Sequence, residues 1–111
     1  MPPRSDLLQG TLDMLILKTL DAGPLHGYAI GQHINRTSRA LLQVPQGSLY
    51  PALHRLENQG LLGAEWIETE AGRAAKVYRL TKKGRARLDA EIADWRRMSE
   101  AIALVLQSSL A

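Results

Sequence analysis

Residues 46–61, QGSLYPALHRLENQGL, constrain the fold more than any other stretch of this chain. Three leucines recur at helical spacing, which predicts a helix with one buried face. They are Leu49, Leu53 and Leu56. Gly60 stands where a left-handed residue would end that helix, and Leu61 would then contact Leu56 in a Schellman ending. The stretch therefore predicts a short helix that packs on a core.

The opposite face of this predicted helix is small and polar and carries no carboxylate. Its residues are Gly47, Ser48, Pro51, His54, Arg55 and Asn58, with Tyr50 on its flank. Such a face fits a DNA groove, but it also fits an ordinary solvated surface.

The first residue of this helix has two alternatives as well: either Ser48 is the N-cap and Pro51 costs no hydrogen bond, or the helix begins near Gln46 and Pro51 removes one. In both cases residues 46–51 lie near the end whose N–H groups attract phosphate.

Composition excludes several classes of protein. A chain of 111 residues with 45% hydrophobic and 23% charged residues is a single globular unit with a modest core. It has no cysteine, which rules out disulfides and thiolate metal sites. No apolar run is long enough to span a membrane, and no secretory signal is recognisable at the start. We expect a cytoplasmic protein without cofactors.

The basic residues are unevenly distributed. Net charge is only +3, but seven of the 14 basic residues lie in one stretch, 73–87, which contains no acid. They are Arg73, Lys76, Arg79, Lys82, Lys83, Arg85 and Arg87. Such a cluster is typical of a surface that meets nucleic acid, although the last four are expected to form a generally electropositive, solvated flank.

The first part of the chain predicts two helices. Asp6 is a candidate N-cap for a helix that runs to about Leu20, with Leu8, Leu12, Leu15, Ile16 and Thr19 on its apolar stripe. The sequence 21–24, Asp-Ala-Gly-Pro, ends it. A second helix is expected from near His26 to about Thr37, burying Ala29, Ile30 and Ile34.

Two features of the second helix have simple structural explanations. Gly27 and Gly31 are four residues apart and favour close packing of another helix rather than a ligand site. His26 and His33 could share a face, but no third ligand stands near them. We therefore predict no metal site.

A β-hairpin is predicted after Gly60. Residues 64–69 read as a strand, 70–73 as a turn and 74–80 as the returning strand. Alternation assigns Tyr78 and Leu80 to the core side of the return strand. Arg73 lies at the tip and Lys76 follows it. Next to a DNA-binding helix, these two cations would be candidates for holding phosphates.

A long C-terminal helix is predicted from a cap at Thr81, with Gly84 as a weak point in its first turn. Apolar positions then repeat at heptad spacing: Leu88, Ile92, Trp95, Ser99, Ile102 and Leu106. About 25 helical residues span roughly 38 Å, more than a small core needs. Because an exposed seam would be an aggregation liability, we predict that it packs against a second copy of the chain.

The expected order is helix, helix, helix, hairpin, helix. This order predicts a mainly α (α+β) fold, a winged helix-turn-helix with a two-stranded wing and a long C-terminal dimerisation helix. We expect residues 1–81 to form the DNA-binding domain and residues 82–111 the dimerisation helix.

Several motifs agree in order and spacing with one family. The runs 49–57 (LYPALHRLE), 60–61 (GL), 78–81 (YRLT) with Gly84, and 25–30 (LHGYAI) resemble the PadR family of bacterial transcriptional regulators. The resemblance extends from about Leu8 to Leu88. The C-terminal helix is similar only in position and character, and resembles that of the shorter members, which use it to dimerise.

This resemblance implies a function. It implies a homodimeric transcriptional regulator, a repressor, that binds a palindromic operator in double-stranded DNA and is not an enzyme. The family's DNA-contacting positions carry over to Gln46, Ser48, Tyr50, Pro51, His54, Arg73 and Lys76. Arg55 is a further candidate for DNA contact, or pairs instead with an acid on the surface.

Trp95 has two interpretations. A drug-sensing member of the family is similar in carrying a tryptophan on its dimerisation helix, which implies a planar aromatic effector held by Trp95 and its symmetry mate. Alternatively, Trp95 only fills the dimer core. A rival function for the whole chain is a winged-helix protein-interaction or small-molecule-sensing module without specific DNA binding.

Overall fold

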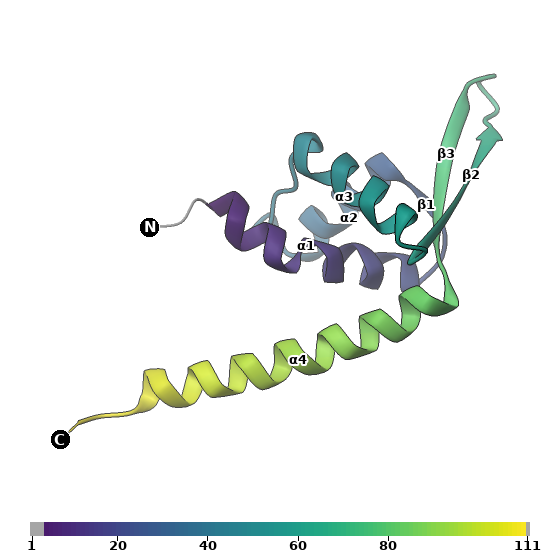
Figure 1. Cartoon of the computed structure of the whole chain (residues 1–111). Coiled ribbons are helices and arrows are strands. Elements are labelled where there is room, and N and C mark those ends of the chain that lie inside the picture. The colour runs from purple at the N-terminus through teal and green to yellow at the C-terminus, as the bar shows by residue number, and fades with distance from the viewer. Residues whose placement is uncertain (1–3, 111) are drawn as a thin grey trace.

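The computed structural model describes the backbone of residues 4–110 and the side chains of residues 11–110. The elements follow the chain as α1 (Arg4–Asp21), β1 (Leu25–His26), α2 (Gly27–Thr37), α3 (Gln46–Asn58), β2 (Leu62–Glu68), β3 (Ala74–Leu80) and α4 (Lys82–Gln107). The three helices α1, α2 and α3 pack together, the hairpin β2–β3 rises from one side, and α4 runs beneath α1 (Figure 1). This is a winged helix-turn-helix, as predicted.

Helix α1 supplies much of the core. Leu12, Ile16, Leu17 and Leu20 are buried, and the buried Thr19 hydroxyl donates to the Leu15 carbonyl at 2.8 Å. The helix begins at Arg4, so the prediction that Asp6 is its N-cap was wrong. Asp6 lies in the first turn of the helix. Acidic residues are favoured both at an N-cap and within the first turn, so the sequence did not distinguish these positions.

Close packing of α2 on α3 depends on the two glycines. A Cβ at Gly27 would lie 2.8 Å from Tyr50 Cε1, and one at Gly31 would lie 3.2 Å from Leu49 Cδ2. The prediction of close helix packing at these glycines is thus confirmed. Of the three apolar residues expected to be buried on α2, Ile30 and Ile34 are buried and Ala29 is intermediate.

The ending of α3 was predicted in detail. Gly60 has φ +76°, Leu61 N–H donates to the Leu56 carbonyl at 3.0 Å, and Gly60 N–H donates to the Glu57 carbonyl at 3.0 Å. These are the two hydrogen bonds of the Schellman motif. Leu56 and Leu61 are both buried in the core. The chain therefore leaves α3 at a fixed angle and enters β2.

The sheet has three strands in the order β1-β3-β2, all antiparallel. The prediction of a two-stranded sheet missed β1, in which Leu25 pairs with Tyr78 and His26 with Val77. A strand of two residues is too short to show alternation in a sequence. Tyr78 is buried and Leu80 packs against the core, as alternation predicted.

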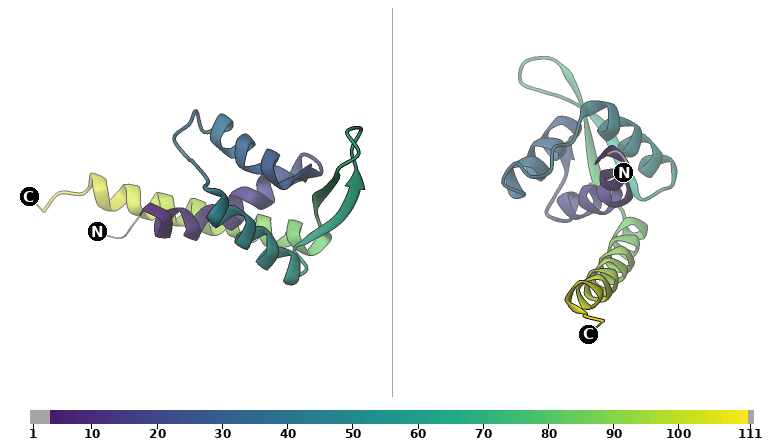
Figure 2. Two further views of the ribbon diagram at one scale, coloured as in Figure 1. Left: turned by 90° about the horizontal axis from the view of Figure 1, so that it is seen from above. Right: turned by 90° about the vertical axis from the view of Figure 1, so that its left-hand side faces the viewer.

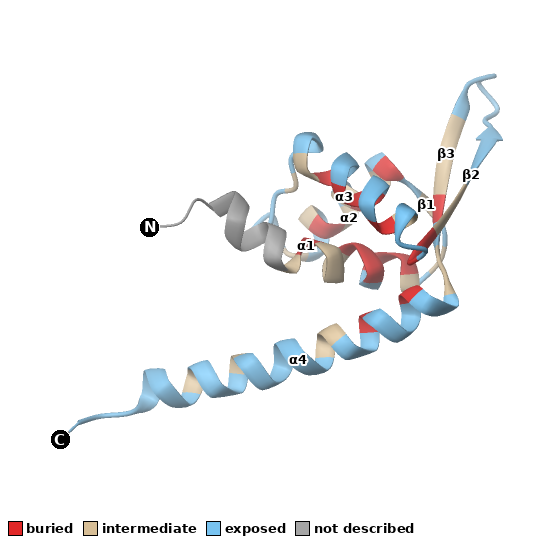
Figure 3. Cartoon of the chain, in the orientation of Figure 1, coloured by how far each residue is buried: buried red, intermediate tan, exposed pale blue. Residues whose placement is uncertain are grey.

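Helix α4 starts in the core and then leaves it. The Thr81 hydroxyl accepts from Gly84 N–H at 3.0 Å and donates to the Gly60 carbonyl at 2.8 Å, which confirms Thr81 as the N-cap. Two further views show the later part of α4 projecting from the other elements, along a molecule 67 Å long (Figure 2). Gly84 and Leu88 are buried, whereas the residues beyond Ile92 are mostly exposed (Figure 3).

Candidate nucleic-acid interface

Helix α3 divides into a buried back and an exposed front. Its back is made by Leu49, Ala52, Leu53 and Leu56. We define the α3 front as the outward-facing residues Gln46, Gly47, Ser48, Tyr50, Pro51, His54 and Asn58, of which Ser48 is half-buried and the others are exposed. No carboxylate belongs to it. Sequence and structure agree here, except that Arg55, which the sequence placed on this face, pairs with Asp13 of α1. The helical period determines which of the other side chains share the face.

The start of α3 settles the alternatives left open by the sequence. The helix begins at Gln46, with Pro45 as N-cap and no side chain capping it. Pro51 is consequently inside the helix, where it cannot donate to the carbonyl of Gly47. Ser48 lies in the first turn and is not the N-cap. The front of this turn presents Gln46 and Ser48 at the end of the helix where the backbone dipole favours an anion.

Tyr50 is anchored by packing. Its ring edge lies against the backbone of Gly27, where a Cβ would come within 2.8 Å, and the residue remains 41% exposed. A ring held in this way has little freedom, so it presents its hydroxyl from a defined position. The α2 glycine is thus part of what orients a residue of the α3 front.

Arg55 is engaged within the protein. Its Nη2 lies 2.5 Å from Oδ1 of Asp13 on α1. Of the two sequence-based interpretations of Arg55, the structure shows the pairing with a neighbouring acid. The guanidinium joins α3 to α1 and is already partly neutralised there.

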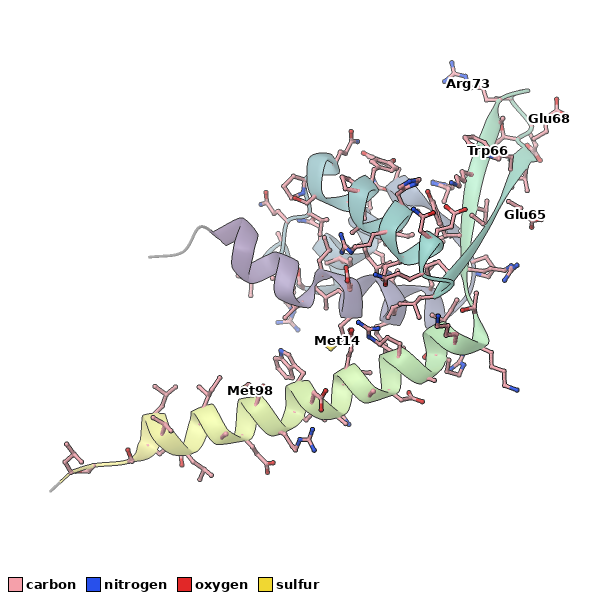
Figure 4. All side chains as sticks on the ribbon, viewed as in Figure 1. Met14, Glu65, Trp66, Glu68, Arg73 and Met98 are labelled. Carbon is pink, nitrogen blue, oxygen red and sulfur yellow. The ribbon has the colours of Figure 1, made fainter. Side chains whose placement is uncertain are left out.

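The wing, defined as residues 62–80, carries Arg73 near its tip. Gly72 has φ +78° and makes the turn, in which Thr69 N–H donates to the Arg73 carbonyl at 2.8 Å. The Arg73 side chain is exposed, and Figure 4 shows it on the side of the wing that faces α3. In the part of the chain whose side chains are described, no ion pair involves Arg73. Its position suits a contact with phosphate.

Lys76, the other predicted phosphate ligand, lies closer to the base of the wing and is paired. Its Nζ is 2.8 Å from Oε1 of Glu57 on α3 and 5.3 Å from the centre of the Tyr78 ring. The hydrogen bond with Glu57 raises the pKa of Lys76, although partial desolvation opposes the shift. The ammonium thus lies between the Glu57 carboxylate of α3 and the Tyr78 ring of β3.

Sequence reasoning gave no role to Trp66. It is 68% exposed, pairs across the hairpin with Lys76, and in Figure 4 points to the α3 side of the wing, whereas Glu65 points away. The alternation of β2 predicts that it shares a face with Ala64, but it does not predict its exposure. That exposure depends on how far the wing extends beyond the helices, which is a property of the whole fold.

A shallow hollow of about 430 Å³ lies between α2 and the start of α3. It is lined by Tyr28, Gly31, Gln32, Asn35, Gln43, Val44, Pro45, Gln46 and Leu49. None of these side chains is charged. The hollow borders the α3 front at Gln46, and the exposed Tyr28 at the start of α2 lines it as well. The uncharged surface of the α3 front therefore continues across the hollow to α2.

The predicted dimerisation residues divide into two groups. Leu88 is only 2% exposed and Ile92 packs partly against the chain's own core. Ser99 is intermediate, and Trp95, Ile102 and Leu106 are exposed. Within residues 11–110, whose side chains are described, the later part of the heptad seam is therefore mostly uncovered.

Two negative observations apply to the described residues alone. No group of three histidine, aspartate or glutamate side chains there is placed to hold a metal ion. No helix in that part of the chain is long and apolar enough to cross a membrane.

Comparisons with known proteins fit this architecture. The family model for the transcriptional regulator PadR-like family matches residues 16–90. A transcriptional regulator of Mycobacterium tuberculosis is 45% identical over 64 residues, which cover 58% of this chain and 56% of that protein.

Solved structures show the same likeness over nearly the whole chain. A PadR family transcriptional regulator from Eggerthella lenta has a TM-score of 0.82 at 32% identity, covering 94% of this chain and 88% of that one. A PadR-like transcription factor from Bacteroides fragilis has a TM-score of 0.75 at 34% identity, covering 92% and 96%. The segment that matches the family model includes α3 and the wing, which carry the candidate interface, and also α2 and the start of α4. The chain belongs to the PadR-like family of transcriptional regulators.

Proposed function

We propose that this protein is a homodimeric repressor that binds a palindromic operator in double-stranded DNA through the α3 front and the wing. The observation that carries the proposal is an exposed, carboxylate-free helix face next to a hairpin with an exposed arginine near its tip. Repression is the mode of action that the family resemblance implies.

In the proposed complex, the α3 front enters the major groove. Gln46 and Ser48 stand at the first turn, where recognition helices meet base edges. Tyr50, Pro51 and His54 follow along the same face and meet bases or the flanking backbone. Arg73 reaches the phosphates beside the groove. These contacts combine base reading with sequence-independent attraction.

The homodimer is proposed to form through the exposed part of α4. Trp95, Ile102 and Leu106 lie on one stripe with the half-buried Ser99, and Met98 and Val105 widen it. An apolar stripe of this length is stabilised when a second copy covers it. Two-fold symmetry would then place the two copies of α3 about one turn of DNA apart, roughly 34–36 Å.

The test is binding to a duplex that the protein selects from a random pool, measured over a range of salt concentrations. Arg73→Ala should weaken binding to all sequences, and the slope of log K against log salt should fall by about 1 for each phosphate that the variant no longer neutralises. Arg96→Ala removes the same charge from an exposed position on α4 and is the matched control. Gln46→Ala and Ser48→Ala should instead change the preference at particular base pairs.

Two outcomes would reject this DNA-binding mode. One is wild-type protein that is not retained by duplex DNA at low salt, which would favour the protein-interaction module. The other is Arg73→Ala, Gln46→Ala and Ser48→Ala variants that all bind with unchanged affinity and preference.

A second proposed activity is sensing of a planar aromatic effector at Trp95. The observation that favours it is that Trp95 and the thioether of Met98 are both exposed on α4, while Met14 of α1 points towards α4 (Figure 4). Thioethers adapt to aromatic surfaces of different shape. In a Trp66→Phe background, planar aromatic compounds should quench Trp95 fluorescence and lower operator affinity together. Unchanged fluorescence and affinity across a broad panel would leave Trp95 as a residue of the dimer core.

A further inference from the structure

The outer half of the wing has little support. Strand β1 pairs with Tyr78 and Val77 only, so the hairpin has no third strand from Lys76 to the tip. Trp66, Ile67 and Glu68 on β2 are exposed in this outer half. A two-stranded hairpin on its own is marginally stable in water. Something must fix its direction if Arg73 is to meet a phosphate.

Among the described side chains, the ion pair that joins this half of the wing to α3 is Lys76–Glu57. Glu57 lies in the last turn of α3, and the 2.8 Å hydrogen bond spans 19 residues of sequence. The two side chains are 27% and 30% exposed, and the Tyr78 ring lies under the ammonium. We propose that this ion pair fixes the angle of the wing relative to α3, so that Lys76 is a positioning residue and not a phosphate ligand. The inference rests on the proposed DNA-binding mode.

Electrostatics supports this assignment. If Lys76 moved to a phosphate, Glu57 would stay half-buried beside polyanionic DNA with its cation gone, and leaving one partner of such a pair alone is costly. If the pair stays intact, its net charge is zero and it adds little to the attraction of DNA. Arg73 has no carboxylate partner among the described side chains, so its charge remains available for the DNA backbone.

Glu57→Gln separates the two roles by the sign of its effect. It removes a negative charge near DNA and releases Lys76, so a phosphate-binding Lys76 would make binding tighter and the salt slope steeper. A positioning pair predicts the opposite, with operator binding weakened about two- to five-fold, the range of exposed ion-pair coupling. Glu100→Gln, an exposed acid of α4, is the control for charge alone.

Lys76→Met completes the cycle. Operator affinity should fall as much as in Glu57→Gln, the salt slope should stay unchanged, and the double variant should be no weaker than either single one. Exchanging the charges with Glu57→Lys and Lys76→Glu together should restore part of the affinity. Hydrogen exchange should quicken at residues 66–76 in both single variants, while their thermal midpoints stay near that of the wild type.

Tighter binding by Glu57→Gln, or a salt slope lowered by about 1 in Lys76→Met, would overturn the inference and return Lys76 to the phosphates. Either result would leave the proposed function intact, because wild-type binding and the effect of Arg73→Ala are measured separately. Absence of operator binding by the wild type would reject the DNA-binding mode itself, and with it the inference.

Discussion

The two halves of α4 share one heptad pattern and have different surroundings. In the first half, Gly84 and Leu88 are buried against the core, and Arg85 Nη1 lies 2.5 Å from Oδ1 of Asp21 at the end of α1. In the second half, Trp95 and Leu106 are exposed, and the ion pair between Asp94 and Arg97 joins two residues of α4 itself. One half is part of the winged-helix core, and the other projects away from it.

This difference shows that a heptad repeat does not identify its partner. Leu88 and Leu106 belong to the same seam, but Leu88 is covered by the same chain. Coverage of the seam by the protomer's own core therefore ends near Ile92, where burial becomes partial. We expect variants of the first half to act on the stability of the protomer and variants of the second half to act on assembly.

The largest effect is expected from breaking the two halves separately. Leu88→Ala should lower the free energy of unfolding by about 2–5 kcal/mol, because it leaves a cavity in the core. Ile102→Asp should leave the protomer folded but prevent assembly, since it places an unpaired charge in the proposed interface. Urea unfolding and sedimentation at several protein concentrations would measure both.

Concentration dependence distinguishes the two variants. Unfolding of a dimer depends on protein concentration, so the midpoint should keep this dependence in Leu88→Ala and lose it in Ile102→Asp. An Ile102→Asp protein that sediments as a dimer would contradict the proposed interface. A wild-type monomer at micromolar concentration would contradict it more broadly.

A somewhat smaller effect is expected at Gly84, for which the sequence was misleading. Read as part of a helix, this glycine predicts a weak point that alanine would improve by about 1 kcal/mol. In the structure, a Cβ there would lie 2.1 Å from the backbone oxygen of Leu61 and 2.8 Å from Leu80 Cδ1. Gly84 is therefore a site of close approach between α4 and the link that joins α3 to β2, and not a defect of the helix.

Gly84→Ala should accordingly destabilise the protein by a net ~2 kcal/mol, lowering the thermal midpoint by roughly 5–10 °C, because overpacking outweighs helix propensity. Gly47→Ala is the matched control, since a Cβ on that helical glycine would meet nothing within 4 Å. It should raise the midpoint slightly or leave it unchanged. If both variants raised it equally, the close approach at Gly84 would be refuted.

What the sequence predicted depends on how local the determining contacts are. The Schellman ending at Gly60 and the Thr81 cap are made by hydrogen bonds between residues no more than five positions from each other, so their signals lie in the local sequence. The additional bonds from Thr81 back to residues 60 and 61 are the exception. The faces of α3 followed from its period. These features account for most of the fold and for the composition of the α3 front.

What the sequence could not predict are the contacts between distant elements. Arg55 with Asp13 and Lys76 with Glu57 are 42 and 19 residues apart, and many other acids were equally available in the sequence. The sequence therefore made both cations candidates for DNA contact, and only the structure shows the carboxylates beside them. The same reason applies to β1, whose two residues become a strand only by pairing with β3.

The smallest effect is expected at Asp21, which ties the first half of α4 to α1. The hydrogen bond from Arg85 lowers the pKa of Asp21 below its ordinary value of 3.8, with Lys18 adding to the shift and partial burial opposing it. A lowered pKa in the folded state means that the carboxylate stabilises the fold above pH 3.8 and that this contribution is lost as the pH falls through the lowered value.

Asp21→Asn should therefore be less stable than the wild type near neutral pH, and the difference should shrink on acidification. Asp89→Asn, an exposed position on α4, should show little difference at any pH. Denaturant midpoints measured from neutral pH to below 3.8 test this, and a gap between Asp21→Asn and wild type that stays constant over that range would show that the ion pair does not join the two helices in solution.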